Sequence, residues 1–274
     1  PRGEGKGPDA PRAARRRRGG VEARRIARHM SIGGWILAVA AALGVGIGKA
    51  GLSGLGLFHV LVFAFLFGAR ASTGVVLPLL LVGDVAAVRT FRQHARWDYV
   101  RRMLPPACLG VVLAAWFMRD LDETLYRPVI GWITLILSIL QLVRMYRPGW
   151  LGNVPHARWF AWTMGILAGA ATMLANAAGP VFAVYLIAVG LPKMEFVGTS
   201  AWFFFIINLF KVPFSIALGL IRGQTLLLNL ILAPTVLAGV LTGRWLLERI
   251  PQRLFEHLLL AFAVIAALRL IAGF

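Results

Sequence analysis

Apolar residues dominate the chain from residue 31 to its end, and polar residues divide them into ten segments. These segments lie at about 31–48, 51–69, 71–88, 103–118, 128–146, 159–175, 177–190, 196–213, 225–247 and 255–273. Several are shorter than the roughly 20 residues that a helix needs to cross a bilayer. No polar linker longer than a connecting loop separates them. The pattern predicts an all-α polytopic membrane protein with 8 to 10 transmembrane segments, in one domain covering residues 31–274.

Small, polar and cationic residues interrupt this apolar pattern at two places. The run NAAGP (176–180) separates two apolar segments in the second half, and Lys49-Ala50-Gly51 does the same in the first half. Because a bilayer offers no water to unpaired peptide groups, a helix can break inside it only where the break lines a protein-enclosed cavity. Both breaks are therefore candidates for a transport site.

The order of motifs in the first half recurs in the second half. The first half contains GVGIGKAGLSGLG (44–56), LPLLLVGDVAAVRTF (77–91) and PPACLGVVLAAWFMRDL (105–121). The second half contains GILAGAATMLANAAGP (165–180), AWFFFIINLFKVPF (201–214) and APTVLAGVLTGRWLLERI (233–250). This order predicts two homologous repeats, at about 31–146 and 157–274, each with about five apolar segments and one broken or re-entrant segment. Such repeats are common in secondary transporters.

The repeats contain G-xxx-G pairs at Gly44/Gly48 and at Gly165/Gly169. Close packing of two helices explains these pairs without any role in transport.

Arginine-rich loops bear on the topology, because short cytoplasmic loops carry an excess of Lys and Arg. If all ten segments cross the membrane, the loop 89–102 with its five arginines lies outside. If the broken segments form re-entrant hairpins, eight crossings remain, and we expect the loops 89–102 and 144–158 to join the N-terminus in the cytoplasm. We favour the second arrangement.

Composition supports a membrane location and describes a separate tail. Charged residues make up 15% of the 274 positions, against roughly 25% in soluble domains. Residues 1–30 carry ten Lys/Arg and three acids, which accounts for much of the net charge of +18. We predict a disordered basic cytoplasmic tail that contacts anionic membrane lipid and not nucleic acid, on a multi-pass protein of the cytoplasmic (inner) membrane.

The chain lacks signs of catalysis or metal binding. No HExxH, GxSxG, Walker loop or CxxC motif occurs. The single cysteine, Cys108, allows no intrachain disulfide, and the five histidines have no spacing typical of metal ligands. We therefore expect no enzyme activity, no cofactor and no metal site. Transport would be driven by an ion or substrate gradient, or by a separate subunit.

Ionisable residues inside the apolar segments are functional candidates, because each costs roughly 2.5 to 3.5 kcal/mol to insert. Asp84 is predicted either to pair with Arg89 or Lys49 or to carry a proton. Lys211 either lines the site or extends to the headgroups. Lys193 is a candidate for gating or for anchoring its turn. Lys49 lies between glycines and alanine, whose small side chains let a bound anion approach the backbone.

One helix face adds to these candidates. Ser200, Phe204, Asn208 and Lys211 follow at spacings of four, four and three residues, so they share a face. Phe203-Phe204-Phe205 and most tryptophans are expected to face lipid or the interface, with Trp202 as an exception. The substrate-binding candidates are Lys49, Gly51, Ser53, Asn176, Gly179, Pro180, Thr199, Ser200, Trp202, Asn208 and Lys211.

Three stretches resemble the TauE/SafE family of sulfite exporters, also called the toluene-sulfonate uptake permease family (TSUP). They are GIGKAGLSGLG (46–56), LPLLLVGDVAAVRTFRQHARWDYVRRMLP (77–105) and GPVFAVYLIAVGLPKMEFVGTSAWFFFIINLFKVPFSIALGLI (179–221). The resemblance covers the chain from about residue 40 onward. It implies a secondary transporter of sulfite, sulfonates or related organosulfur anions, coupled to protons. A homodimer is a further possibility.

Two alternatives compete with an organosulfur transporter. A permease for another small anion or for a metal ion would use the same fold, although hard cations require several oxygen ligands. A membrane scaffold or assembly protein would use the basic tail for docking and would not need broken helices. Deleting residues 1–28 separates these classes, because a transporter should retain its flux.

Overall fold

The computed structural model describes residues 30–50, 55–121, 123–147, 158–221, 223–247 and 268. The basic tail predicted to be disordered lies outside these residues. The described elements are α2 (Ile32–Lys49), α3 (Leu55–Phe67), α4 (Ala69–Phe91), the 3₁₀ turn η1 (Arg92–His94), α5 (Trp97–Phe117), α6 (Glu123–Tyr146), α7 (Arg158–Ala175), α8 (Gly179–Ala188), α9 (Lys193–Ala217) and α10 (Gly223–Leu247). No strand occurs in this part of the chain, which confirms the all-α prediction.

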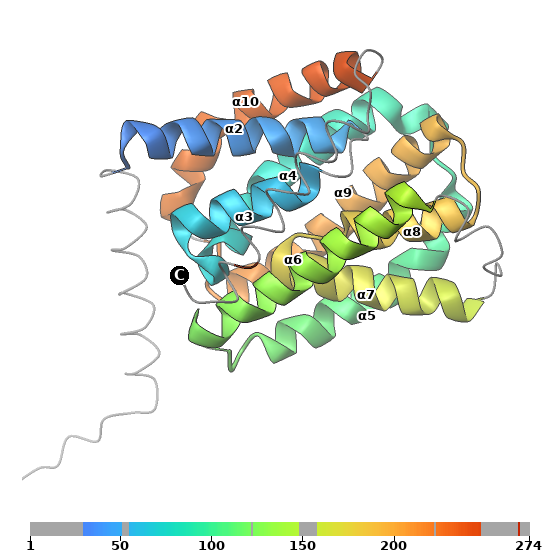
Figure 1. Ribbon diagram of the computed structural model, residues 1–274, viewed down its shortest axis with the longest axis horizontal. Helices are drawn as coiled ribbons and strands as arrows, with labels where there is room; N and C mark the ends of the chain where they lie inside the picture. The colour runs from blue at the N-terminus through green and yellow to red at the C-terminus, as the bar shows by residue number, and fades with distance from the viewer. Residues whose placement is uncertain are drawn as a thin grey trace, which may run out of the picture.

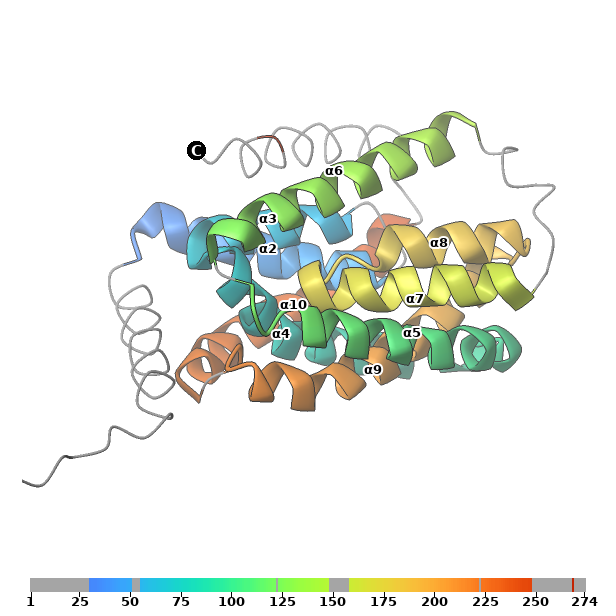
Figure 2. The same ribbon diagram turned by 90° about the horizontal axis from the view of Figure 1, so that it is seen from below.

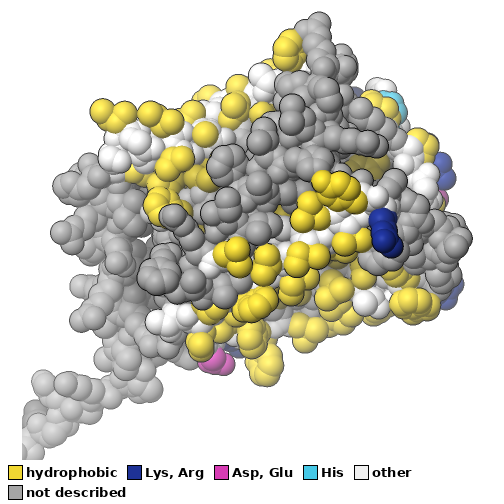
Figure 3. All heavy atoms as spheres, viewed as in Figure 1, with side chains coloured by type: hydrophobic (Ala, Val, Ile, Leu, Met, Phe, Trp, Pro, Cys, Tyr) yellow, Lys and Arg dark blue, Asp and Glu magenta, His cyan; other side chains and the backbone are white. Residues whose placement is uncertain are grey.

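Five described helical segments are long and apolar enough to cross a membrane. They are Ile32–Lys49, Ala69–His94, Trp97–Phe117, Met194–Ala217 and Thr225–Trp245, and shorter apolar helices occur at Leu57–Phe67 and Thr124–Leu140. Large apolar side chains also cover the outside of the bundle, as Figure 3 shows for one face. Trp116, Trp132, Leu230 and Leu241 are each more than half exposed. Lipid tails are the environment that suits such a surface.

The helices lie mostly along the long axis of the bundle (Figure 1, Figure 2). Among the described helices, the two most extensive contacts join α5 to α7 and α2 to α10. In each pair the helices run parallel. Gly46 of α2 meets Val236 and Gly239 of α10, and Gly169 of α7 meets Ala107 of α5.

Glycines allow this close approach. A Cβ atom on Gly169 would collide with the carbonyl oxygen of Ala107, and one on Gly165 would collide with Pro106. The pair Gly165/Gly169 therefore packs helices, as the simpler explanation of G-xxx-G expects. In α2 the glycine in closest contact is Gly46, which lies between the members of the predicted pair Gly44/Gly48.

The two helix breaks lie where the sequence predicts them. Helix α7 ends at Ala175, and α8 begins at Gly179. Asn176 lies between them with a φ of 54°, a left-handed conformation that asparagine tolerates better than most residues. Helix α2 ends at Lys49 and α3 begins at Leu55, while residues 51–54 lie outside the described part of the chain.

The arginine-rich loop and the start of α2 lie at opposite ends of the bundle. Helix α4 runs parallel to α10, since Gly74 lies against Leu220, just before α10, and Gly83 lies against Val236. Helix α2, which is parallel to α10, is therefore parallel to α4 as well. Helix α3 returns the chain to the end where α2 begins, and Gly68, with a φ of 84°, turns it directly into α4. Loop 89–102 therefore lies at the opposite end of the bundle from the start of α2, in contrast to the predicted shared side, while the N-terminal tail itself lies outside the described residues. Loop 89–102 does share its end with the start of α7, because α5 and α7 run parallel.

Two large clusters of buried apolar residues form most of the core, and a third, small one joins α4 to α9. One of the two large clusters is built mainly from α5, α6, α7, α8 and α9, and the other from α2, α3, α4 and α10. Polar residues of α4, α7 and α9 that are buried, together with the partly exposed Lys49 of α2, lie between these two clusters and carry the chemistry described next.

Candidate functional site

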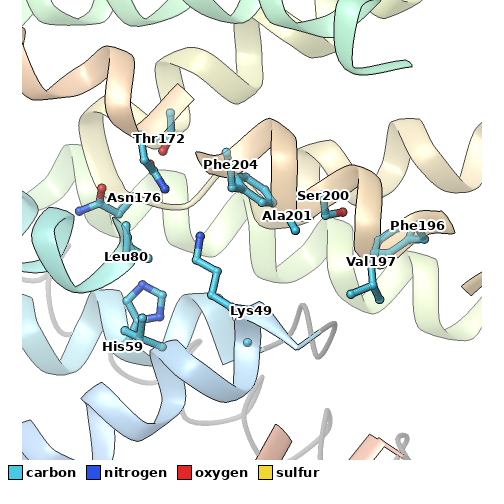
Figure 4. A pocket seen from close by; sticks show the side chains of 15 residues that line it. Lys49, His59, Leu80, Thr172, Asn176, Phe196, Val197, Ser200, Ala201 and Phe204 are labelled. Atoms are coloured by element: carbon cyan, nitrogen blue, oxygen red, sulfur yellow. The ribbon is translucent and has the colours of Figure 1, made fainter. Parts of the chain in front are cut away.

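A cavity of about 80 Å³ lies beside the two helix breaks. This is several times the roughly 10–15 Å³ needed to hold one water molecule, so a small ion fits. Figure 4 shows side chains from α2, α3, α4, α7 and α9 around it. The lining residues are Val45, Gly48, Lys49, His59, Leu80, Thr172, Asn176, Ala178, Gly179, Phe196, Val197, Ser200, Ala201, Phe204 and Asn208.

Lys49 extends from the last turn of α2 into this cavity (Figure 4). Its Nζ lies 2.5 Å from Asp84 Oδ1, and the Asp84 side chain is fully buried. Gly83 makes room for this pairing, because a Cβ atom there would lie 3.2 Å from Lys49 Cγ. Arg89 and Lys49 were the two predicted partners of Asp84, and the ion pair is formed with Lys49.

Asn208 holds the second oxygen of Asp84. Its Nδ2 donates to Asp84 Oδ2 over 2.7 Å. Both carboxylate oxygens are thus occupied, one by Lys49 of α2 and the other by Asn208 of α9. Asp84 is a bridge between the two halves of the bundle.

The ring of Phe204 also contacts the ammonium of Lys49. Lys49 Nζ lies 4.8 Å from the centre of the Phe204 ring, within the range of a cation–π contact. Phe203 is fully buried and stacks on Phe182 with ring centres 4.0 Å apart. The prediction that the run Phe203-Phe204-Phe205 faces lipid or the interface is therefore wrong for Phe203 and Phe204, whose side chains point into the interior of the bundle.

Lys211 is buried behind the cavity, with 1% of its surface exposed. Its Nζ donates to the Thr172 backbone oxygen at 2.7 Å, to Thr172 Oγ1 at 3.0 Å and to Asn176 Oδ1 at 2.6 Å. Asn208 Oδ1 lies 3.4 Å away. These acceptors are all neutral oxygens, and they satisfy the three N–H donors of an ammonium. Lys211 does not extend to the headgroups.

Asn176 ties the α7–α8 break to two other helices. Its Oδ1 accepts from Lys211, and its Nδ2 donates to the Thr73 backbone oxygen of α4 over 3.0 Å. The left-handed conformation of Asn176 directs its side chain toward these partners. The break is therefore fixed by side-chain hydrogen bonds as well as by its backbone.

Two lysines and one acid are the ionisable members of this network. In their ordinary charged forms, Lys49 and Lys211 carry two positive charges against the single negative charge of Asp84. Lys211 and Asp84 are buried, and the Lys49 side chain is 11% exposed. An uncompensated charge in a low-dielectric interior is costly, so this arrangement favours an anion in the adjacent cavity. The N-terminus of α8 begins at Gly179 on the cavity wall and adds partial positive charge at the same place.

Several other predicted site residues lie elsewhere or outside the described chain. Thr199 Oγ1 accepts from the Arg96 backbone N–H over 3.0 Å, and Trp202 packs on Trp97 with ring centres 5.0 Å apart. Both residues join α9 to the segment after η1 and are not among those lining the cavity. Pro180 is in the first turn of α8, and Lys193 begins α9. Gly51 and Ser53 lie outside the described residues.

Ser200, Phe204 and Asn208 do line the cavity, on the single α9 face that their spacing predicts. The sequence analysis missed Thr172 and His59. Thr172 lies one helical turn before Asn176, so the i, i+4 rule gave a signal for it. His59 was given no role because the five histidines have no spacing typical of metal ligands, and only the fold brings it to the cavity beside Lys49.

The donors around the cavity do not fit a metal cation. The described residues contain no group of three or more His, Cys, Asp or Glu side chains that would hold one. The carboxylate at the site is already paired with Lys49, and a hard cation would need several oxygen ligands in place of two lysines.

Comparison with known protein families matches residues 36–270 to one family, described as sulfite exporter TauE/SafE. No curated protein and no solved structure matches the chain. The family is one of membrane transporters, in agreement with the apolar helices of the bundle. The match spans nearly the whole helical region, including both breaks and the cavity between them. The chain is therefore a multi-pass membrane protein that belongs to the sulfite exporter TauE/SafE family.

Proposed function

We propose that this protein is a secondary transporter of sulfite, sulfonates or related small organosulfur anions across the cytoplasmic membrane. One observation carries the proposal: buried Lys211, buried Asp84 and Lys49, whose side chain is 11% exposed, lie together beside a cavity of about 80 Å³. An oxyanion in the cavity would neutralise the excess charge. A cation would add to it.

The anion would bind where Lys49, Ser200 and the start of α8 meet the cavity. An ammonium group has three N–H donors, and Asp84 takes one of them from Lys49. The amide groups of Asn176 and Asn208 donate to Thr73 and Asp84, so these side chains position the lysines. Oxyanions suit a compact ammonium combined with helix N-terminal amides.

The proposed role of Asp84 is to pair with Lys49 and hold it in place. The support is geometric, since Lys49 and Asn208 occupy its two oxygens. Removing the carboxylate would leave the Lys49 cation without its partner. A proton carrier for the transport cycle should instead be sought on the cavity wall.

We further infer that the fold is built from two repeats that move relative to one another. The support is reciprocal packing. The first helix of the first half, α2, packs on α10, and the first helix of the second half, α7, packs on α5. When the segments 77–91 and 201–214 are aligned from their first residues, Asp84 falls on Asn208, its hydrogen-bond partner. Rocking of the halves about this contact would expose the cavity alternately to each side.

Transport into proteoliposomes tests the proposal, with sulfite, sulfoacetate, taurine and sulfate as substrates, with and without a pH gradient. Lys49→Ala should lower the apparent affinity for a transported anion about ten- to hundredfold, because hydrogen bonds to charged groups contribute about 1.5 to 3 kcal/mol. Lys49→Arg should not restore it, since a planar guanidinium does not replace a compact ammonium. Arg147→Ala, at the exposed end of α6, is the matched control. Wild-type affinity in Lys49→Ala would remove this lysine from the site.

A further inference from the structure

His59 is a titratable side chain on the wall of the same cavity. It belongs to α3, whose other described residues are apolar or glycine. Its exposed fraction is 4%, and its ring lies beside Lys49 and Leu80 in Figure 4. The fold therefore brings an imidazole to the place where the anion is proposed to bind.

The charged groups around His59 come from the helices packed against α3. They are Lys49 on α2 and Asp84 on α4, with Lys211 on α9 behind the cavity. The two arginines of α4 lie elsewhere: Arg70 donates to backbone oxygens of Met118 and Leu121, and Arg89 is in the last turn. Among the described residues on the cavity wall, His59 is the one with a kind of side chain that ordinarily gains or loses a proton between about pH 5 and 8.

We propose that His59 is the proton-linked group of the anion site, so that an anion and a proton bind to the site together. This inference rests on the proposed function. An anion in the cavity would stabilise the imidazolium, and by linkage the imidazolium would strengthen anion binding. One proton taken from the solution on the open side joins the imidazole and leaves with the anion on the other side. Asp84 does not serve this purpose because Lys49 and Asn208 hold it.

The size of the effect follows from electrostatics. A unit charge roughly 8 to 12 Å from the anion changes its affinity about ten- to thirtyfold, at an effective dielectric constant of about 20. The anion should therefore bind about ten- to thirtyfold more tightly when His59 is protonated. Lysine at this position would imitate the protonated state at every pH.

The test uses the full chain and methanesulfonate, which keeps its single charge between about pH 5.5 and 8.5, so that only the protein titrates. In the wild type, affinity should rise about ten- to thirtyfold as the pH falls through this range. His59→Gln should bind weakly and without pH dependence, and His59→Lys should bind tightly and without pH dependence. His94→Gln, at an exposed residue of η1, is the matched control and should behave as the wild type.

Proton uptake by the wild type gives a measurement that needs no variant. Adding methanesulfonate to the protein in weakly buffered solution near pH 7 should make the medium more alkaline, as a proton enters with the anion. Anion binding without proton uptake, or a pH dependence retained in His59→Gln, would overturn the assignment of His59 and leave the transport proposal standing. Failure of the wild type to bind or transport any of the tested anions would reject the transport proposal itself.

Discussion

At the scale of single residues, the site is a chain of partners that alternate in charge and polarity. Lys49 pairs with Asp84, Asp84 accepts from Asn208, and Asn208 lies beside Lys211. Removal of one member therefore affects the next. The charged residues can therefore be tested in pairs, because removing both members of an ion pair should destabilise the protein less than removing either member alone.

Asp84→Asn should destabilise the protein, because it leaves the Lys49 ammonium without its carboxylate. Removing one partner of a buried ion pair costs about 3 to 5 kcal/mol. The double variant Lys49→Met with Asp84→Asn should recover most of this loss. Thermal unfolding in detergent and the yield of monodisperse protein measure both effects. A stable Asp84→Asn single variant would show that Asp84 does not hold Lys49 in place.

At the scale of elements, the helix pairs α2–α10 and α5–α7 make the most extensive contacts among the described helices. Their contact depends on glycines whose Cβ positions are already occupied by the partner helix. Long side chains there would force the helices apart and would move both breaks, because α2 and α7 lead directly into them.

Gly169→Ala should destabilise the bundle by about 1 to 3 kcal/mol, the usual cost of overpacking. The added Cβ would collide with the Ala107 carbonyl oxygen. Gly223→Ala is the matched control, because no atom lies within 4 Å of its Cβ position. The midpoint of thermal unfolding measures the difference. Equal unfolding midpoints for the two variants would mean that α5 and α7 can move apart without loss of stability.

Local sequence signals predicted the elements and both breaks. Asn176 followed by Gly179-Pro180 ends one helix and begins another for local reasons, as a left-handed residue and a helix-starting proline do. The α9 face with Ser200, Phe204 and Asn208 also followed from spacing alone. The burial of Phe203, by contrast, depends on Phe182 of another helix, so the sequence did not reveal it.

At the scale of the whole molecule, the basic segments of the chain do not gather at one end of the bundle. The basic tail precedes α2, whose start lies at one end, and the loop with five arginines (89–102) lies at the other. Charge alone suggested one side for both, because the sequence does not reveal that α3 returns the chain to the end where α2 begins and that α4 then runs to the other end. The pairing of Lys49 with Asp84 was within reach of the sequence, whereas the approach of Lys211 to Thr172 was not.

Cysteine labelling tests this arrangement. In a Cys108→Ala background, cysteines at Gln93 and Asp120 should react with impermeant reagents from opposite sides of the membrane. Gln93 is exposed in η1, and Asp120 is exposed after α5, which separates the two ends. Labelling of both from the same side would contradict the described order of the helices.

The central claim is that the excess positive charge of the buried network binds an anion. Lys211→Met tests it most directly, because this change removes the excess charge and leaves the Lys49–Asp84 pair intact. The measurement is equilibrium binding of sulfite and methanesulfonate to purified wild type and variant by calorimetry, with thermal unfolding to confirm that the variant is folded. The account predicts a loss of affinity of about tenfold or more, the effect of one unit charge within roughly 12 Å. A folded Lys211→Met protein that binds both anions with wild-type affinity would contradict it.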